Sequence, residues 1–217
     1  MKTTRKFTLW SGVSLLLAFI LWTVLVRTVD VQPIGPLDSA VGLATVNRAV
    51  HRLTGVHTSL YVLTDWLGLV PIGVAVGFAI LGLVQWIRRR NLWRVDQDIL
   101  ALGGFYLAVI AVYLLFELVS VNYRPVLIHG ALETSYPSST TMLAMCVMPT
   151  ALLLLRARIH GGALRTLISV GISAFIVLMV VGRILSGVHW ITDIIGGALI
   201  SAGLVLIYAS VAQVSKK

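Results

Sequence analysis

Long apolar segments separated by short polar ones dominate the pattern of this chain. The first runs from Phe7 to Val26 and follows several basic residues. Five further apolar segments cover roughly 66–86, 99–119, 140–155, 167–185 and 191–211. Each is about 16 to 21 residues long, close to the length that a helix needs to cross a bilayer. The pattern predicts an all-α protein with six transmembrane helices, in a single membrane-embedded domain over 1–217.

The first apolar segment resembles a signal peptide, because basic residues precede it. Its apolar part is too long for one, and no small-residue cleavage site follows before Arg27 and Asp30. We therefore predict an uncleaved first transmembrane helix. The single domain is expected to consist of about 1–65, the first span with its outer loop, and about 66–217, a core bundle.

Composition supports a membrane protein. Of 217 residues, 58% are hydrophobic and only 12% are charged, which is too apolar for a soluble domain. The 17 Lys and Arg residues exceed the 8 Asp and Glu residues, and we interpret this excess as membrane topology rather than nucleic-acid binding. The single cysteine, Cys146, excludes a disulfide framework and a thiolate metal site, and its apolar neighbours predict core packing.

The distribution of basic residues predicts the orientation. With the N-terminus in the cytoplasm, twelve basic residues lie inside: Lys2, Arg5, Lys6, Arg88, Arg89, Arg90, Arg94, Arg156, Arg158, Arg165, Lys216 and Lys217. Five lie outside: Arg27, Arg48, Arg52, Arg124 and Arg183. This bias follows the positive-inside rule and predicts that both termini are cytoplasmic. A chain of this size without a soluble domain is expected in a bacterial plasma membrane.

The first outer loop, residues 30–65, carries a helical pattern of its own. Apolar residues recur there at helical spacing, at Leu43, Val46, Val50 and Leu53. Polar residues including Arg48 and His51 fall on another side. The pattern predicts an amphipathic interfacial helix from near Asp38-Ser39 to Gly55. It serves either as a structural cover or as a lid that guides a lipid substrate.

Three polar residues stand between the last two spans. Arg183, His189 and Asp193 lie close together, and such groups in a membrane protein usually have a functional reason. His189 and Asp193 are four residues apart, so on a helix they share a face and the carboxylate can orient the ring. Arg183 precedes them across Gly187, where the backbone can bend, and can clamp an anion. The alternative is a membrane-edge arginine with an interfacial His–Trp pair.

The second outer loop, residues 120–139, joins the third and fourth spans. The third span ends with Glu117 and the pair Arg124-Pro125. Because the residue before a proline is pushed out of helical geometry, we expect the helix to finish near Tyr123. Glu117 would then lie on the same helix face as Arg124, two turns deeper.

The fourth span opens with Pro137-Ser138-Ser139. A proline followed by hydroxyl residues at a helix start supplies free backbone N–H groups and the positive end of the helix dipole, which favours an anion. The motif alone is also an ordinary helix cap. Together with Arg124 and Arg183 it predicts a phosphate site beside His189.

The order of these residues resembles the three motifs of the type 2 phosphatidate phosphatase superfamily. That superfamily includes lipid phosphate phosphatases, undecaprenyl diphosphate phosphatases and vanadium haloperoxidases. The residues that carry the resemblance are Arg124-Pro125, Pro137-Ser138, Arg183, His189 and Asp193. The likeness covers the last four spans and implies that superfamily's helix-bundle core. It also implies a membrane phosphatase that hydrolyses a lipid phosphate or polyprenyl diphosphate at the outer face.

The resemblance further implies a role for each matching residue. His189 would attack phosphorus to form a phosphohistidine, and Asp193 would orient it. Arg124, Arg183, Ser138 and the backbone at Ser139 would bind the phosphate oxygens. No metal or other cofactor would be required.

The chain departs from the family pattern at three positions. Glu117 stands where the first motif has lysine, Thr140 stands where the second has the histidine that protonates the leaving group, and Gly182 replaces a serine. Three interpretations follow: the substrate is a diphosphate, Glu117 is a surrogate acid, or the protein binds or transports a lipid phosphate without hydrolysis. A simple ion pair of Glu117 with Arg124 or Arg183 is equally open.

Two other histidines are weaker candidates. His129 lies in the second outer loop and could assist proton transfer, although a surface position is the ordinary role of such a residue. His160 falls in an inner loop, on the wrong side for this chemistry.

Overall fold

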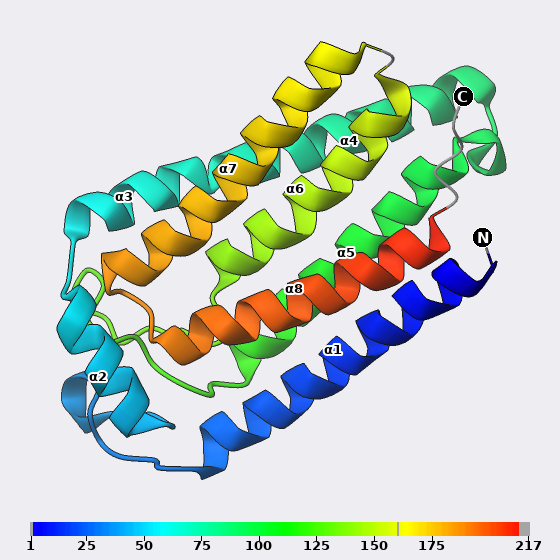
Figure 1. The fold of residues 1–217 in the computed structure, drawn as a ribbon. Coiled ribbons are helices and arrows are strands. Elements are labelled where there is room, and N and C mark those ends of the chain that lie inside the picture. Colours follow the sequence, from blue (N-terminus) through cyan, green and yellow to red (C-terminus); the bar gives the residue numbers. More distant parts are fainter. Residues whose placement is uncertain (1, 160, 213–217) are drawn as a thin grey trace.

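The computed structural model describes residues 2–159 and 161–212; His160, Lys216 and Lys217 lie outside the described residues. The described part is helical, with isolated bridges in its loops (Figure 1). Its α-helices are α1 (Lys2–Thr28), α2 (Ala44–Thr54), α3 (Thr58–Leu67), α4 (Leu69–Arg89), α5 (Gln97–Leu118), α6 (Ser139–Arg158), α7 (Gly162–Ser186) and α8 (Ile191–Val211). Two 3-10 turns cover Pro36–Asp38 and Leu92–Arg94.

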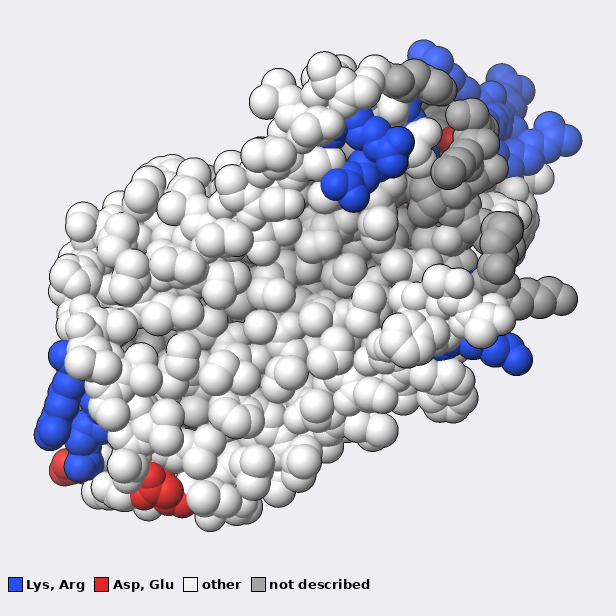
Figure 2. All heavy atoms as spheres, viewed as in Figure 1, with Lys and Arg blue, Asp and Glu red and all other residues white. Residues whose placement is uncertain are grey.

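Six helical segments of the described chain are long and apolar enough to cross a membrane, with α3 and α4 together forming the span Thr58–Arg89. The prediction of an all-α, six-span protein is therefore confirmed. Figure 2 shows that charged side chains gather at the two ends of the molecule and leave a broad uncharged surface between them. The end that holds the start of α1 and the end of α8 also holds the arginines in the last turns of α4 and α6, whereas α2 lies at the opposite end (Figure 1).

Two boundaries near the first outer loop differ from the prediction. The second span begins at Thr58 rather than near Trp66, because α3 leads into α4 with only Gly68 between them. The interfacial helix begins at Ala44 rather than near Asp38-Ser39, because residues Pro36–Asp38 form a separate 3-10 turn. Its end at Gly55 is confirmed.

The end of the third span was predicted wrongly. Helix α5 stops at Leu118, five residues before Tyr123. The following residues pair with the chain that returns to α6: the Arg124 N–H donates to the Glu133 carbonyl, and the Ser135 N–H donates to the Asn122 carbonyl. These loop hydrogen bonds take the place of helical ones, so α5 ends before the chain reaches Pro125. Glu117 thus stays in the last turn of α5, while Arg124 lies in the loop and does not share its helix face.

Helix α8 occupies the centre of the packing and approaches two neighbours closely. It packs along α1, where a Cβ added to Gly203 would lie 2.8 Å from Leu16 Cδ2. It also packs on α6, where a Cβ added to Gly197 would lie 3.1 Å from the Ser138 carbonyl oxygen. Cys146 is buried in the core, as the sequence predicts.

The turn between α7 and α8 is fixed by a close contact with the first outer loop. Gly187 ends α7 with a φ of 67°, a left-handed conformation that favours glycine. A Cβ there would lie only 1.9 Å from the Gly55 carbonyl oxygen, and the His57 N–H donates to the Ser186 carbonyl. The outer loop therefore rests directly on the turn that precedes His189.

We expect Gly187→Ala to lower the free energy of unfolding by about 1 to 3 kcal/mol, because a side chain there is strained and collides with backbone. Thermal unfolding of the detergent-solubilised protein measures the change. Gly171→Ala, inside α7 with no neighbouring atom of the described chain within 4 Å of an added Cβ, is the matched control and should be neutral or stabilising. Equal stability of Gly187→Ala and the unmodified protein would show that the turn tolerates a side chain.

Candidate active site

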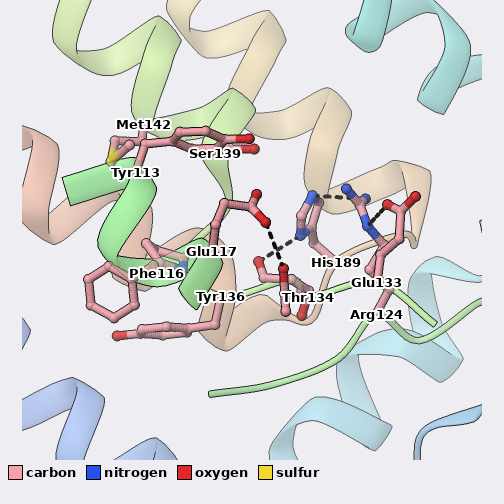
Figure 3. A pocket seen from close by; sticks show the side chains of 12 residues that line it. Tyr113, Phe116, Glu117, Arg124, Glu133, Thr134, Tyr136, Ser139, Met142 and His189 are labelled. Atoms are coloured by element: carbon pink, nitrogen blue, oxygen red, sulfur yellow. Dashed lines mark hydrogen bonds and ion pairs between the residues drawn. The ribbon is translucent and has the colours of Figure 1, made fainter. Parts of the chain in front are cut away.

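His189 lies in the connection between α7 and α8 and is 4% exposed. Its Nδ1 atom lies 3.2 Å from the Ser135 carbonyl oxygen, and its Nε2 atom lies 3.3 Å from Arg124 Nη1 (Figure 3). A carbonyl only accepts and a guanidinium only donates, so a neutral ring with its proton on Nδ1 satisfies both contacts. This arrangement leaves the Nε2 lone pair facing Arg124.

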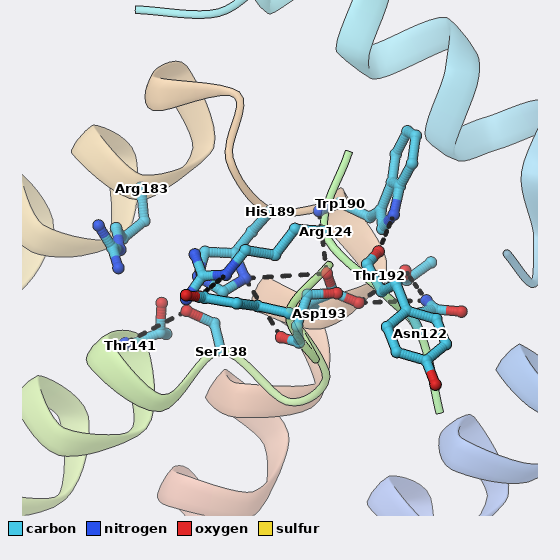
Figure 4. A network of polar contacts seen from close by, with 12 residues as sticks. Asn122, Arg124, Ser138, Thr141, Arg183, His189, Trp190, Thr192 and Asp193 are labelled. Carbon is cyan, nitrogen blue, oxygen red and sulfur yellow. Dashed lines mark hydrogen bonds and ion pairs between the residues drawn. The ribbon is translucent and has the colours of Figure 1, made fainter. Parts of the chain in front are cut away.

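Asp193 lies in the first turn of α8 and is fully buried (Figure 4). Its Oδ2 is 3.8 Å from His189 Nδ1, beyond hydrogen-bond length, and accepts from the Trp190 N–H at 3.0 Å. Its Oδ1 accepts from Asn122 Nδ2 at 3.2 Å and from Thr192 Oγ1 at 3.5 Å. The two predicted partners are adjacent, although His189 precedes the helix, and the Ser135 carbonyl makes the closer contact to the ring.

The pKa of His189 is lowered to about 4, chiefly by burial and also by the charges of Arg124 and Arg183, while the nearby Asp193 carboxylate opposes this shift by raising the pKa. Desolvation penalises the charged imidazolium, and two nearby cations add to that cost. The ring is therefore neutral near pH 7, as a nucleophile must be.

Arg124 connects the histidine to an acidic residue of the same loop. Its Nε atom lies 3.1 Å from Glu133 Oε2, and this ion pair leaves Nη1 directed at His189 (Figure 3). No motif or spacing in the chain singles out Glu133, because only the pairing of the loop with itself brings the two side chains together.

Arg183, in the last turn of α7, is only 1% exposed. Its Nη1 donates to Thr64 Oγ1 at 3.2 Å and its Nη2 donates to Thr140 Oγ1 at 2.8 Å, with Asp65 Oδ1 at 3.7 Å. A Cβ added to Gly182 would lie 2.7 Å from Thr64 Cγ2, so α3 leaves no room there for the usual serine. In this protein the hydroxyl of Thr140 therefore accepts a hydrogen bond from Arg183.

A cavity of about 490 Å³ opens beside these groups. It is lined by Tyr113, Phe116, Glu117, Arg124, Glu133, Thr134, Ser135, Tyr136, Pro137, Ser139, Met142 and His189. Of the predicted site residues, Glu117, Arg124, Ser139 and His189 line it, whereas Ser138, Arg183 and Asp193 lie outside this lining.

Several buried polar atoms of the predicted site and its neighbours have no hydrogen-bond partner in the described chain. They are Ser135 Oγ, Thr141 Oγ1 and Arg183 Nε. Ser138, which caps α6, accepts from the Thr141 N–H at 3.5 Å and stands beside them (Figure 4). Buried polar groups are rarely left without partners, and an anion would satisfy these donors.

Glu117 points into the cavity toward His189 (Figure 3). Its Oε2 atom accepts from Thr134 Oγ1 at 3.5 Å, and the described residues contain no ion pair between Glu117 and an arginine. The ion pair with Arg124 that was one alternative for Glu117 is instead made by Glu133. His129 is exposed in the second outer loop and does not line the cavity.

A family model of the PAP2 superfamily matches residues 104–217. The chain belongs to this superfamily. The match includes the three motifs from Arg124 to Asp193 and confirms the resemblance found in the sequence. A comparison with curated proteins found no match.

The structure is also similar to the crystal structure of a transmembrane PAP2-type phosphatidylglycerolphosphate phosphatase from Bacillus subtilis. The likeness covers 92% of this chain and 93% of that one, with 22% sequence identity and a TM-score of 0.53. At this identity it shows a shared fold. Together with the six apolar helices, it identifies this PAP2 chain as an integral membrane protein.

The pKa of His189 makes the stability of this PAP2 protein depend on pH. Between about pH 6.5 and pH 4 the unfolded chain takes up a proton that the folded protein excludes, so stability falls as the pH falls through this window. The loss should approach about 3 kcal/mol. His189→Gln should flatten this slope in thermal unfolding, while above pH 7 the two proteins should change in parallel. An unchanged slope would contradict a buried neutral His189.

Proposed function

We propose that this PAP2 protein hydrolyses a phosphate or diphosphate group carried by a membrane lipid, at the outer face of a bacterial plasma membrane. The observation that carries the proposal is the neutral, buried His189, whose Nε2 lone pair meets Arg124 at the edge of a cavity. Membership of a superfamily with phosphatase members supports it. The basic residues that gather at the opposite end of the bundle support the outer location, because positive ends face the cytoplasm.

The phosphate would bind where buried donors converge. Arg124 would turn part of its guanidinium from Nε2 of His189 to the phosphate, since both cannot occupy the same place at 3.3 Å. Arg183 Nε and Thr141 Oγ1, which have no partner in the described chain, would be satisfied there together with Ser138. The first N–H groups of α6, at Ser139, point out of the helix and would bind a phosphate oxygen.

The chemistry would proceed in two displacements. Nε2 of His189 attacks phosphorus, the bond between phosphorus and the leaving oxygen breaks, and the leaving group departs with that electron pair. Asp193 and the Ser135 carbonyl hold the Nδ1 side of the ring, which becomes positive. A water then attacks the phosphohistidine, phosphate is released, and Nε2 regains its lone pair.

The leaving group decides which lipids react. A positioned general acid typically contributes about 10² to 10⁴ in rate. Thr140 cannot be that acid, because an alcohol hydroxyl does not give up its proton near neutral pH, and its oxygen already accepts a hydrogen bond from Arg183. The leaving group of a lipid diphosphate is the lipid monophosphate, whose second pKa of about 6 lets it leave with little protonation. For a monoester, whose leaving group needs a proton, Glu117 would be the acid, because its carboxyl group points into the cavity.

A second candidate function is binding or transport of a lipid phosphate without hydrolysis. The hydrogen bond of Thr140 to Arg183 favours it, because the position that holds the family's acid now serves a binding arginine. Binding of a lipid phosphate by the purified protein without any turnover would support this candidate.

Purified protein should release phosphate from at least one member of a panel of mono- and diphosphate lipids. His189→Ala should reduce turnover by about 10³-fold or more, since the covalent route is removed. Millimolar vanadate should inhibit, because it adopts the trigonal-bipyramidal geometry that the site would stabilise. Turnover that survives both treatments would exclude the phosphohistidine mechanism.

Diphosphate lipids should be cleaved faster than matched monophosphate lipids with the same tail. Glu117→Gln should slow monoester cleavage far more than diphosphate cleavage if Glu117 is the acid, and both alike if it only shapes the site. Glu117→Lys combined with Thr140→His should raise monoesterase activity, because it restores the family's residues. Equal rates on phosphatidate and diphosphates in the unmodified protein would disprove the preference.

A further inference from the structure

Asn122, which is not among the residues that carry the family resemblance, is fully buried behind the cavity. Its side-chain oxygen accepts from the Gly42 N–H at 3.1 Å, and its Nδ2 donates to Asp193 Oδ1 at 3.2 Å and to Thr192 Oγ1 at 3.3 Å (Figure 4). A backbone N–H only donates and a carboxylate only accepts, so the amide has a single orientation that satisfies both.

A second fully buried asparagine connects the same network to α2. Asn47 Nδ2 donates to the Gly42 carbonyl at 2.8 Å and to Thr192 Oγ1 at 3.0 Å, while its Oδ1 accepts from the Thr192 N–H at 3.3 Å. The first outer loop is thereby bonded to the start of α8, next to Asp193. A lid that opens for each substrate would have to break these buried bonds, which favours the structural cover over the lid as the role of α2.

We propose that Asn122 is a positioning residue for the His189–Asp193 pair. It does not line the cavity, so it acts through the carboxylate of Asp193, which it holds facing the ring while Asn47 fixes Thr192 on the other side. The inference rests on the proposed hydrolysis and adds the first outer loop to the parts of the protein that set its rate.

Asn122→Asp tests this inference with little change in shape. One oxygen of the new carboxyl group can still accept from the Gly42 N–H, which leaves the other about 3.2 Å from Asp193 Oδ1. Two carboxyl groups so close share one proton until the pH exceeds the raised pKa of the pair. Below that pH the shared proton replaces the amide hydrogen, and above it the two charges repel.

The expected result is therefore a new alkaline loss of activity. At low pH the kcat of Asn122→Asp should approach that of the unmodified protein, and it should fall by about 10- to 100-fold as the pair loses its proton. KM should change little. The charged and titratable groups around the His189–Asp193 pair are Arg124, Arg183, Tyr136 and, from α2, His51 against Trp190, and all of them are present in both proteins. A pH profile and kcat identical to those of the unmodified protein would overturn the inference.

Asn122→Ala and a matched control separate positioning from stability. Thr150 is also fully buried and hydrogen-bonded, but it lies in the middle of α6, so Thr150→Val removes a buried polar contact away from His189. Both variants should lower the melting temperature, whereas only Asn122→Ala should lower kcat per folded molecule, again by about 10- to 100-fold. Equal kcat in the two variants would also overturn the inference.

A readout without turnover distinguishes failure of this inference from failure of the proposed function. In protein labelled with carbon-13 histidine, the His189 signal is assigned by its loss in His189→Gln. Asn122→Asp should add a second inflection to its titration, at the pKa of the carboxyl pair, that the unmodified protein and Thr150→Val lack. If no lipid is hydrolysed but this inflection appears, the contact of residue 122 with the His189–Asp193 pair is supported and the proposed function is wrong. A single unshifted inflection in Asn122→Asp refutes the coupling.

Discussion

The buried carboxylate of Asp193 is the interaction on which the rest of the site depends. A carboxylate in this position is costly unless its oxygens are satisfied. Here the Trp190 N–H, Asn122 and Thr192 donate to it, and the backbone carbonyl of Asp193 accepts from the Ser138 N–H. These bonds join the start of α8 to the start of α6 and to the second outer loop. Because His189 lies in the short connection just before α8, these bonds also determine where its ring lies.

The arginines of the site are balanced by acidic residues from outside the motifs. Glu133 pairs with Arg124, and Asp65 lies near the more deeply buried Arg183. Such pairs lower the cost of keeping cations close together when no anion is bound. They also compete with a phosphate for the same guanidinium groups, so the affinity for substrate reflects a difference between two ionic interactions.

The replacements relative to the family pattern have distinct structural effects. Thr140 makes a short hydrogen bond to Arg183, and Gly182 gives α3 the room to approach that arginine. The first change ties the third motif to the start of the fourth span, and the second brings the third motif closer to the second span. Glu117 has no such bond to an arginine in the described chain and remains at the cavity, where its carboxyl group faces whatever enters.

The sequence by itself determined the six spans, the family and the residues that carry the resemblance, because lipid allows few backbone structures and the third motif has a specific spacing. Local rules failed where tertiary contacts compete with them. The proline after Arg124 predicted a helix to Tyr123, but pairing between Asn122 and Ser135 ended α5 at Leu118. Likewise, the Asp38-Ser39 signal marked a 3-10 turn instead of the start of α2.

Only the tertiary structure decided which groups surround His189. The Ser135 carbonyl holds its Nδ1, yet a backbone atom leaves no trace in residue identity. Asn47 and Asn122 are ordinary polar residues in the sequence, 75 positions apart, and become partners of the site through Gly42 and Thr192. Hydrogen bonds of this kind depend on where the chain returns to itself, which spacing along one segment cannot specify, whereas the spans depend on local hydrophobicity alone.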